Sequence, residues 1–152
     1  MNRWAALDPG RSKCGLVLVD LDQRVVDVGL VIPPETVAAT LRRWNSPTGL
    51  TGIIIGAGTS SDRWIRELPA VAPVHSVDER GSTLAARGRY WELWPPRGWR
   101  RLVPLGLQTP PGNLDAVAAL VLLEKHLRTR CRWPGTPPIL SLIHISEPTR
   151  PY

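Results

Sequence analysis

The sequence predicts one α/β domain built on a five-stranded mixed sheet, with helices on both faces. Two observations predict this class: three extended segments open the chain, and short strands then alternate with helices. A chain of 152 residues is long enough to bury about two-thirds of the surface that its unfolded form exposes. We therefore expect a single domain, and we assign it to residues 1–139.

The first part of the chain predicts an antiparallel meander of three strands. Apolar and β-branched residues fill the segments 3–7, 15–20 and 24–32. The sequences DPGRSK and LDQ, which join these segments, carry the Pro, Gly and Asp residues that suit tight turns.

The rest of the chain alternates helices and strands. Val37, Leu41 and Trp44 recur at helical spacing, whereas GIIIGAG is too short for a helix and is bounded by glycine, which indicates a buried parallel strand. The expected elements are, in order, a helix at 35–44, a strand at 52–58, a helix at 61–68, a strand at 73–77, a helix at 82–93 and a helix that Asn113 caps and that ends near Leu127. Right-handed crossovers place these helices on both faces.

The last thirteen residues differ in kind from the rest. Residues 140–152, LSLIHISEPTRPY, resemble the in-frame translation of an adapter used in preparing sequencing libraries. We treat this segment as a non-native tail and leave it out of the fold and site interpretation.

The composition indicates which cellular compartment and which binding partners to expect. The formal net charge is +6, and the only lysines are Lys13 and Lys125, so arginine supplies nearly all of the positive charge. Arginine favours bidentate phosphate contacts, which indicates a nucleic acid or another polyanion, although genomic base composition gives the same enrichment. Cys14 and Cys131 form no metal-binding pattern, and no apolar run is long enough to span a bilayer. We expect a cytoplasmic protein with no membrane partner, either a monomer or a dimer.

Three acidic residues stand at the ends of expected elements: Asp8, Glu79 and Asp115. An α/β fold can bring them together, where carboxylates a few Å apart repel by roughly 1–4 kcal/mol per pair. A divalent cation held by oxygen ligands relieves such repulsion. Taken singly, each position also has an ordinary interpretation: a turn at Asp8, a solvated loop at Glu79 and a helix-dipole contact at Asp115. Strand alternation leaves the choice between Asp78 and Glu79 open.

Residues 87–101 combine five arginines with tryptophan and tyrosine. Exposed aromatic rings stack on unpaired bases while arginines hold phosphates, so this segment suits a nucleic acid. We expect Trp91 and Trp94, three residues apart on one helix, to lie in the core instead. The candidate nucleic-acid-binding residues are Lys13, Arg80, Arg87, Arg89, Arg97, Trp99, Arg100 and Arg101.

The motifs LDPGRSKCG, VDERGSTLAA and LDAVAALVLLEKHL, spread over residues 3–128, resemble the YqgF family of RuvC-like nucleases in the RNase H-like group. The resemblance implies Asp8, Glu79 and Asp115 as catalytic and metal-binding carboxylates for Mg²⁺ or Mn²⁺. It also implies a nuclease that processes the 5′ end of pre-16S rRNA, or a Holliday junction resolvase. The chain departs from the family in three respects: it lacks the Gly-Leu-Pro run after the fourth strand, its Trp-rich segment is longer, and no fourth carboxylate accompanies Asp115.

The leading hypothesis is therefore a nuclease that hydrolyses phosphodiester bonds in an rRNA precursor with one or two Mg²⁺ ions, Asp8 bridging them. A resolvase-like nuclease for branched DNA and a catalytically inactive nucleic-acid-binding module are the alternatives. A nucleotide-binding relative of the actin and sugar-kinase fold ranks last, because those proteins use two such domains and this chain has room for one.

Overall fold

The computed structural model describes residues 2–46, 48–58, 60–104 and 114–138, and at Arg100 only the backbone. The expected cap Asn113, part of the Trp-rich segment and the tail at 140–152 lie outside the described residues.

The five expected strands form one sheet. They are β1 (Arg3–Asp8), β2 (Cys14–Asp20), β3 (Val25–Ile32), β4 (Gly52–Ala57) and β5 (Val74–Asp78), arranged in the order β3-β2-β1-β4-β5. The pairs β1/β2 and β2/β3 are antiparallel, whereas β1/β4 and β4/β5 are parallel. The meander and the mixed sheet are both confirmed.

The helices also follow the sequence closely. They are α1 (Val37–Asn45), α2 (Asp62–Glu67), α3 (Ser82–Leu93) and α4 (Asp115–Leu127), with 3-10 turns η1 (Pro34–Thr36), η2 (Leu68–Ala70) and η3 (Gly98–Leu102). The helix expected from residue 35 opens as the 3-10 turn η1, which has Pro34 at its first position. Proline fits that place because it has no N–H to donate and its φ is already helical.

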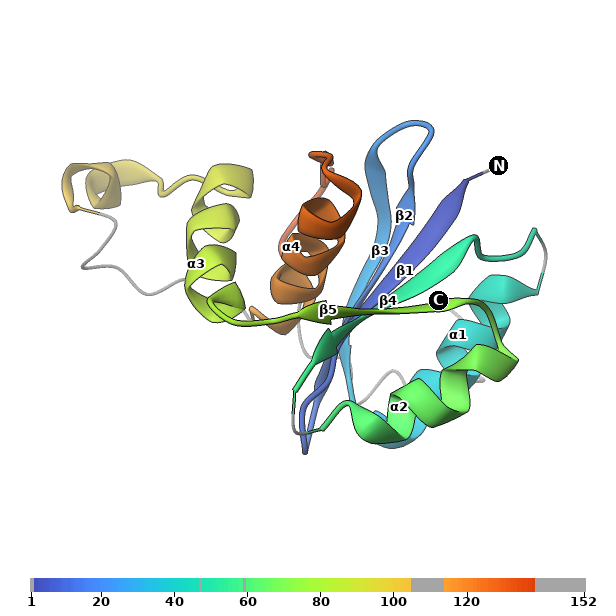
Figure 1. The fold of residues 1–152 in the computed structure, drawn as a ribbon. Coiled ribbons are helices and arrows are strands. Elements are labelled where there is room, and N and C mark those ends of the chain that lie inside the picture. Colours follow the sequence, from blue (N-terminus) through green and yellow to red (C-terminus); the bar gives the residue numbers. More distant parts are fainter. Residues whose placement is uncertain (1, 47, 59, 105–113, 139–152) are drawn as a thin grey trace, which may run out of the picture.

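The sheet separates two apolar layers. Successive strand residues point to opposite faces: Leu7 and Ile55 pack with Trp44 and Trp64 of α1 and α2, while Ile54 packs under α4 on the other face. The helix α3 lies against the outer side of α4, and Figure 1 shows α4 between α3 and the sheet.

This topology gathers chain segments at one edge of the sheet. The strands β1, β4 and β5 are parallel, so their carboxyl ends, at Asp8, Ala57 and Asp78, face the same way. In the antiparallel pairing of β1 with β2, Asp8 lies opposite Gly15. Ligands in open α/β sheets gather outside such strand ends. In the described part of the chain, no helix is both long and apolar enough to cross a membrane.

Candidate functional site

Three elements carry the predicted acidic residues to this edge. Asp8 is the last residue of β1, Glu79 follows the last residue of β5, and Asp115 is the first residue of α4. Behind Asp115, α4 buries Ala116, Ala119, Leu122 and Leu123 in the apolar layer against the sheet. This packing fixes where the first turn of α4 lies.

A glycine lets the first turn of α4 approach the meander. A Cβ atom placed on Gly15 would collide with the backbone carbonyl of Asp115. Since Gly15 pairs with Asp8, the absence of its side chain brings the start of α4 next to the end of β1. The carboxylates of Asp8 and Asp115 become neighbours for this reason.

Two more glycines make room for Glu79. A Cβ atom on Gly56 would lie 2.7 Å from Oε2 of Glu79, and one on Gly58 would collide with Oε1. The Glu79 side chain therefore lies across the end of β4, toward β1. Asp78 is exposed and accepts hydrogen bonds from the backbone N–H and the Nε of Arg80, each at 3.0 Å. The structure thus places Glu79, and not Asp78, beside Asp8, and the signal in the sequence is the pair of glycines in GIIIGAG.

The pKa of Asp8 reflects its burial and its acidic neighbours. Burial, the charges of Glu79 and Asp115, and a side-chain hydrogen bond with Glu79 together raise the pKa of Asp8 from 3.8 to about 7. A hydrogen bond between two carboxyl groups needs a proton on one of them, because two ionised carboxylates are both acceptors. The raised pKa of Asp8 supplies that proton. The buried thiol of Cys14 has a raised pKa, through burial first and then through the charges of Asp8 and Asp115.

Asp115 has a cationic partner. Its Oδ2 lies 3.3 Å from Nζ of Lys13, and both side chains are partly exposed. Across the described residues, no group of three or more His, Cys, Asp and Glu side chains is arranged to hold a metal ion. The charges of Glu79 and Asp115 act on Asp8. Asp8 is hydrogen-bonded to Glu79, and Asp115 forms an ion pair with Lys13.

The chemistry of this set fits a hard divalent cation. All three side chains offer carboxylate oxygens, the ligands that Mg²⁺ and Mn²⁺ prefer. Burial first, and then the charges of the neighbouring carboxylates, raise the pKa of Asp8, and a cation bound beside it would favour its ionised form. The donor chemistry of these residues thus fits the metal that the sequence motifs imply.

The predicted nucleic-acid-binding residues are found in different environments. Arg80, Arg97, Trp99 and Arg101 are exposed and Arg87 is half-buried, while the side chain of Arg100 is outside the described structure. Trp91 is buried and Trp94 is partly buried against the aromatic cluster on α3, as expected.

The prediction for Arg89 is wrong. Its side chain is 9% exposed and makes a bidentate ion pair with Glu124 of α4, at 2.9 and 2.7 Å. It also donates to the carbonyl of Cys131, at 2.8 Å. Arg89 holds α3, α4 and the segment after α4 together and is not available to a nucleic acid. Its partner is 35 residues away on another helix, so no sequence spacing could reveal the pair.

Comparison with known proteins identifies the fold. A solved structure of T. thermophilus RuvC in complex with a Holliday junction substrate matches with a TM-score of 0.51 and 16% sequence identity, covering 86% of this chain and 99% of that chain. No family model and no curated protein sequence matches. The chain therefore has an α/β fold of the RNase H-like class, in its RuvC-like form. Identity this low shows the fold alone.

Sequence reasoning missed a group of cations at the other end of α4. Lys125, Arg128 and Arg130 follow one another closely in EKHLRTRCR, and Arg24 joins them from the turn between β2 and β3. The density of basic residues in this motif is the signal that could have found them.

Proposed function

We propose that this chain is a divalent-metal-dependent nuclease of the YqgF type, which hydrolyses phosphodiester bonds at the 5′ end of pre-16S rRNA in the cytoplasm. One observation carries the proposal: at the carboxyl edge of the sheet, burial and the neighbouring charges of Glu79 and Asp115 raise the pKa of Asp8 to about 7. Burying acidic groups so close together is costly unless a cation accompanies them. The RuvC-like fold and the motif resemblance support the same activity.

The side chains have distinct parts in this proposal. Asp8, Glu79 and Asp115 would hold Mg²⁺ or Mn²⁺, which when bound polarises the phosphate and activates water. Asp8, between the other two acids, must give up its proton to become a ligand. Lys13, beside Asp115, presents an ammonium group at the same edge for a phosphate oxygen. The exposed Arg80, Arg97 and Trp99 would hold the nucleic acid outside it.

Two alternatives each have an observation in their favour. The matched RuvC structure is in complex with a Holliday junction substrate, which favours a resolvase-like nuclease for branched DNA. The acidic side chains of the described residues do not form a complete set of metal ligands, which favours a catalytically inactive nucleic-acid-binding module.

A cleavage assay tests the proposal against both alternatives. An end-labelled precursor of 16S rRNA and a labelled four-way DNA junction are each incubated with the protein in Mg²⁺, in Mn²⁺ and in EDTA. We expect cleavage of the RNA in either metal and none in EDTA. Asp8→Asn and Glu79→Gln should lower the rate on the order of a hundredfold or more, because several kcal/mol of transition-state stabilisation depend on the cation.

Asp78→Asn is the matched control, since Asp78 is the exposed neighbour of Glu79 and pairs with Arg80 instead. This variant should cleave like the wild type. Cleavage of the junction alone would establish the resolvase alternative, and metal-independent binding without cleavage would establish the inactive module. Full activity of Asp8→Asn would contradict the role of the carboxylates.

A further inference from the structure

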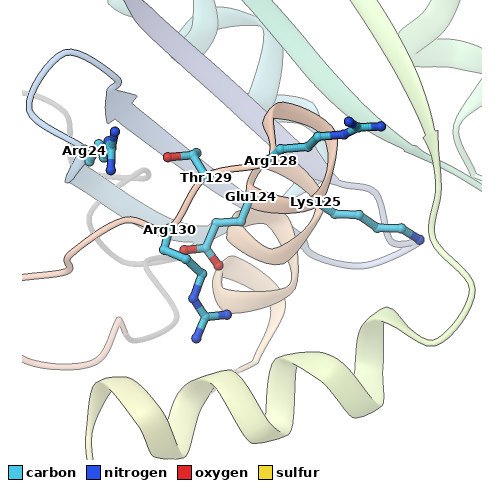
Figure 2. Close-up of a pocket in the computed structure, with 6 residues that line it drawn as sticks. All are labelled: Arg24, Glu124, Lys125, Arg128, Thr129 and Arg130. Carbon is cyan, nitrogen blue, oxygen red and sulfur yellow. The ribbon is translucent and has the colours of Figure 1, made fainter.

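A basic surface surrounds the carboxyl end of α4. Arg24, Lys125, Arg128 and Arg130 line an open depression of about 470 Å³ together with Glu124 and Thr129. Figure 2 shows the four cationic side chains spread around the end of the helix, with Arg24 and Lys125 on opposite sides. We call these four residues the α4-end surface.

Buried contacts hold this surface in shape. Glu124 is 7% exposed, and its carboxylate accepts hydrogen bonds from Arg89 and from the backbone N–H of Cys131, at 2.8 Å. The turn at Arg24 is tied to the segment after α4 by two backbone bonds of 2.8 Å, from the N–H of Val26 to the carbonyl of Arg132 and from the N–H of Arg132 to the carbonyl of Arg24. The turn and the helix end therefore form one rigid unit.

The acids nearby do not neutralise this surface. Glu124 is fully engaged by Arg89, and Arg130 donates to Glu92 at 2.9 Å. Within the described residues, no ion pair involves Arg24, Lys125 or Arg128, and all three are exposed. Three cations thus face solvent around one depression.

The backbone at this surface adds an independent observation. Arg24 and Arg128 have φ angles of 55° and 52°, and they are the only non-glycine residues with positive φ in the described chain. Glycine takes this left-handed conformation without strain, whereas arginine does not. Strained backbone of this kind persists more often at functional positions than elsewhere.

Helix-dipole compensation explains only part of the cluster. Lys125 and Arg128 lie in or next to the last turn of α4, where cations are favourable. Arg24 comes from the turn between β2 and β3, so the helix does not account for its place. A ligand that bridges both elements accounts for all of the cations.

We propose that the α4-end surface binds the sugar-phosphate backbone of a nucleic acid. The cations are spread out and do not converge on a point, so they suit an extended chain of phosphates better than one small anion. The 13 residues of α4 place this surface roughly 18 Å along the helix from Asp115, or about five nucleotide steps. It would therefore hold a part of the strand other than the part at the carboxylates. This inference rests on the proposed function only in taking a nucleic acid as the ligand.

Binding measurements with a double variant test the proposal. Arg24→Gly/Arg128→Gly removes two cations and also relieves the two positive φ angles, so its melting temperature should equal or exceed that of the wild type. Fluorescence anisotropy in EDTA, without cleavage, compares a labelled 20-nucleotide single-stranded RNA with a labelled 6-nucleotide RNA. For the long RNA we expect affinity to fall on the order of tenfold near 0.1 M salt and the salt slope to fall by about 1.4. The short RNA should lose less affinity, because it cannot reach both regions at once.

The control variant is Arg42→Ala/Arg43→Ala, which removes two exposed arginines from α1 on the opposite face of the sheet. It should bind both RNAs like the wild type. An unchanged salt slope for the glycine variant, or an equal loss in the control, would overturn the proposal, as would a wild type that binds neither RNA. The cleavage assay above tests the nuclease activity separately.

A second variant, Lys125→Gln, is needed if the glycine variant melts at a lower temperature than the wild type. A salt slope of RNA binding that is lower by about 0.7 supports the proposal, and an unchanged salt slope overturns it.

Discussion

At the scale of single residues, the buried pair of Arg89 and Glu124 is the interaction that fixes two helices to one another. Two hydrogen bonds join the side chains, and further bonds connect both of them to the backbone of Cys131. Hydrogen bonding with Glu124, and then the charges of Glu124 and Glu92, raise the pKa of Arg89, so the arginine stays ionised in spite of its burial. Removing Arg89 leaves Glu124 buried and unpaired, and removing Glu124 leaves Arg89, among the described residues, with only the exposed Glu92, at 3.6 Å.

We expect Glu124→Ala to lower the free energy of unfolding by about 3–5 kcal/mol, because Arg89 then loses its buried counter-ion. The double variant Arg89→Met/Glu124→Leu should lose less than Glu124→Ala alone, since it leaves no buried charge. Chemical denaturation of the wild type and both variants measures the difference. A double variant less stable than the single one would show that packing around the pair, and not charge, dominates.

At the scale of elements, close approach between backbones decides where the acids lie. The carbonyl of Asp115 occupies the space that a side chain at Gly15 would need. We expect Gly15→Ala to displace the start of α4 and to lower the free energy of unfolding by about 1–3 kcal/mol, as overpacking does. Cleavage should fall as well, because Asp115 moves away from Asp8.

Gly88 provides the matched control for this prediction. It lies inside α3, and nothing is within 4 Å of a Cβ atom placed there. Gly88→Ala should therefore stabilise the protein by about 0.5–1 kcal/mol, because alanine loses less conformational freedom in a helix. Thermal melts show whether Gly15→Ala lowers, and Gly88→Ala raises, the melting temperature of the protein. A stable Gly15→Ala variant with full activity would show that the contact with α4 does not position Asp115.

Local sequence pattern predicted the elements well for a physical reason. The boundaries of α3 at Ser82 and Leu93 agree with the expectation, since a left-handed glycine, Gly81, precedes the helix and proline follows Trp94. Period-two and period-3.6 patterns depend on neighbours in the chain. The environment of Arg89 depends on Glu124, 35 residues away, and so local pattern wrongly indicated a contact with nucleic acid.

At the scale of the whole molecule, the sheet could be predicted from the sequence for two reasons. Crossover connections between parallel strands are right-handed, and buried strands have a recognisable apolar pattern. The carboxylates Asp8 and Asp115 followed from their places at the ends of elements. Strand alternation left Asp78 and Glu79 open and the family resemblance alone chose Glu79, whereas the structure shows the physical reason, because Gly56 and Gly58 leave room for the glutamate. The α4-end surface likewise joins Arg24 to residues about a hundred positions later, a contact that only the folded chain makes.

The pH dependence of the free energy of unfolding should reveal the interaction of Asp8 with Glu79 and Asp115 when no substrate is present. Because the pKa of Asp8 is about 7 in the folded chain and 3.8 is its ordinary value, the native state holds a proton that the unfolded chain has lost between about pH 4 and 7. The contribution of Asp8 to the free energy of unfolding therefore falls as pH rises through this window and is lowest above pH 7.

Denaturation in EDTA from pH 4 to 8 measures this dependence, with Asp8→Asn as the reference because asparagine has no proton to lose. We expect Asp8→Asn to become steadily more stable than the wild type as pH rises from about 4 to 7. At pH 8, Mg²⁺ should narrow this difference: a cation present at 100 times its Kd stabilises the wild type by about 2.7 kcal/mol, whereas the variant has lost a ligand. Parallel pH profiles would contradict the raised pKa. A wild type that gains no more stability from Mg²⁺ than Asp8→Asn would show that the three carboxylates do not share a cation.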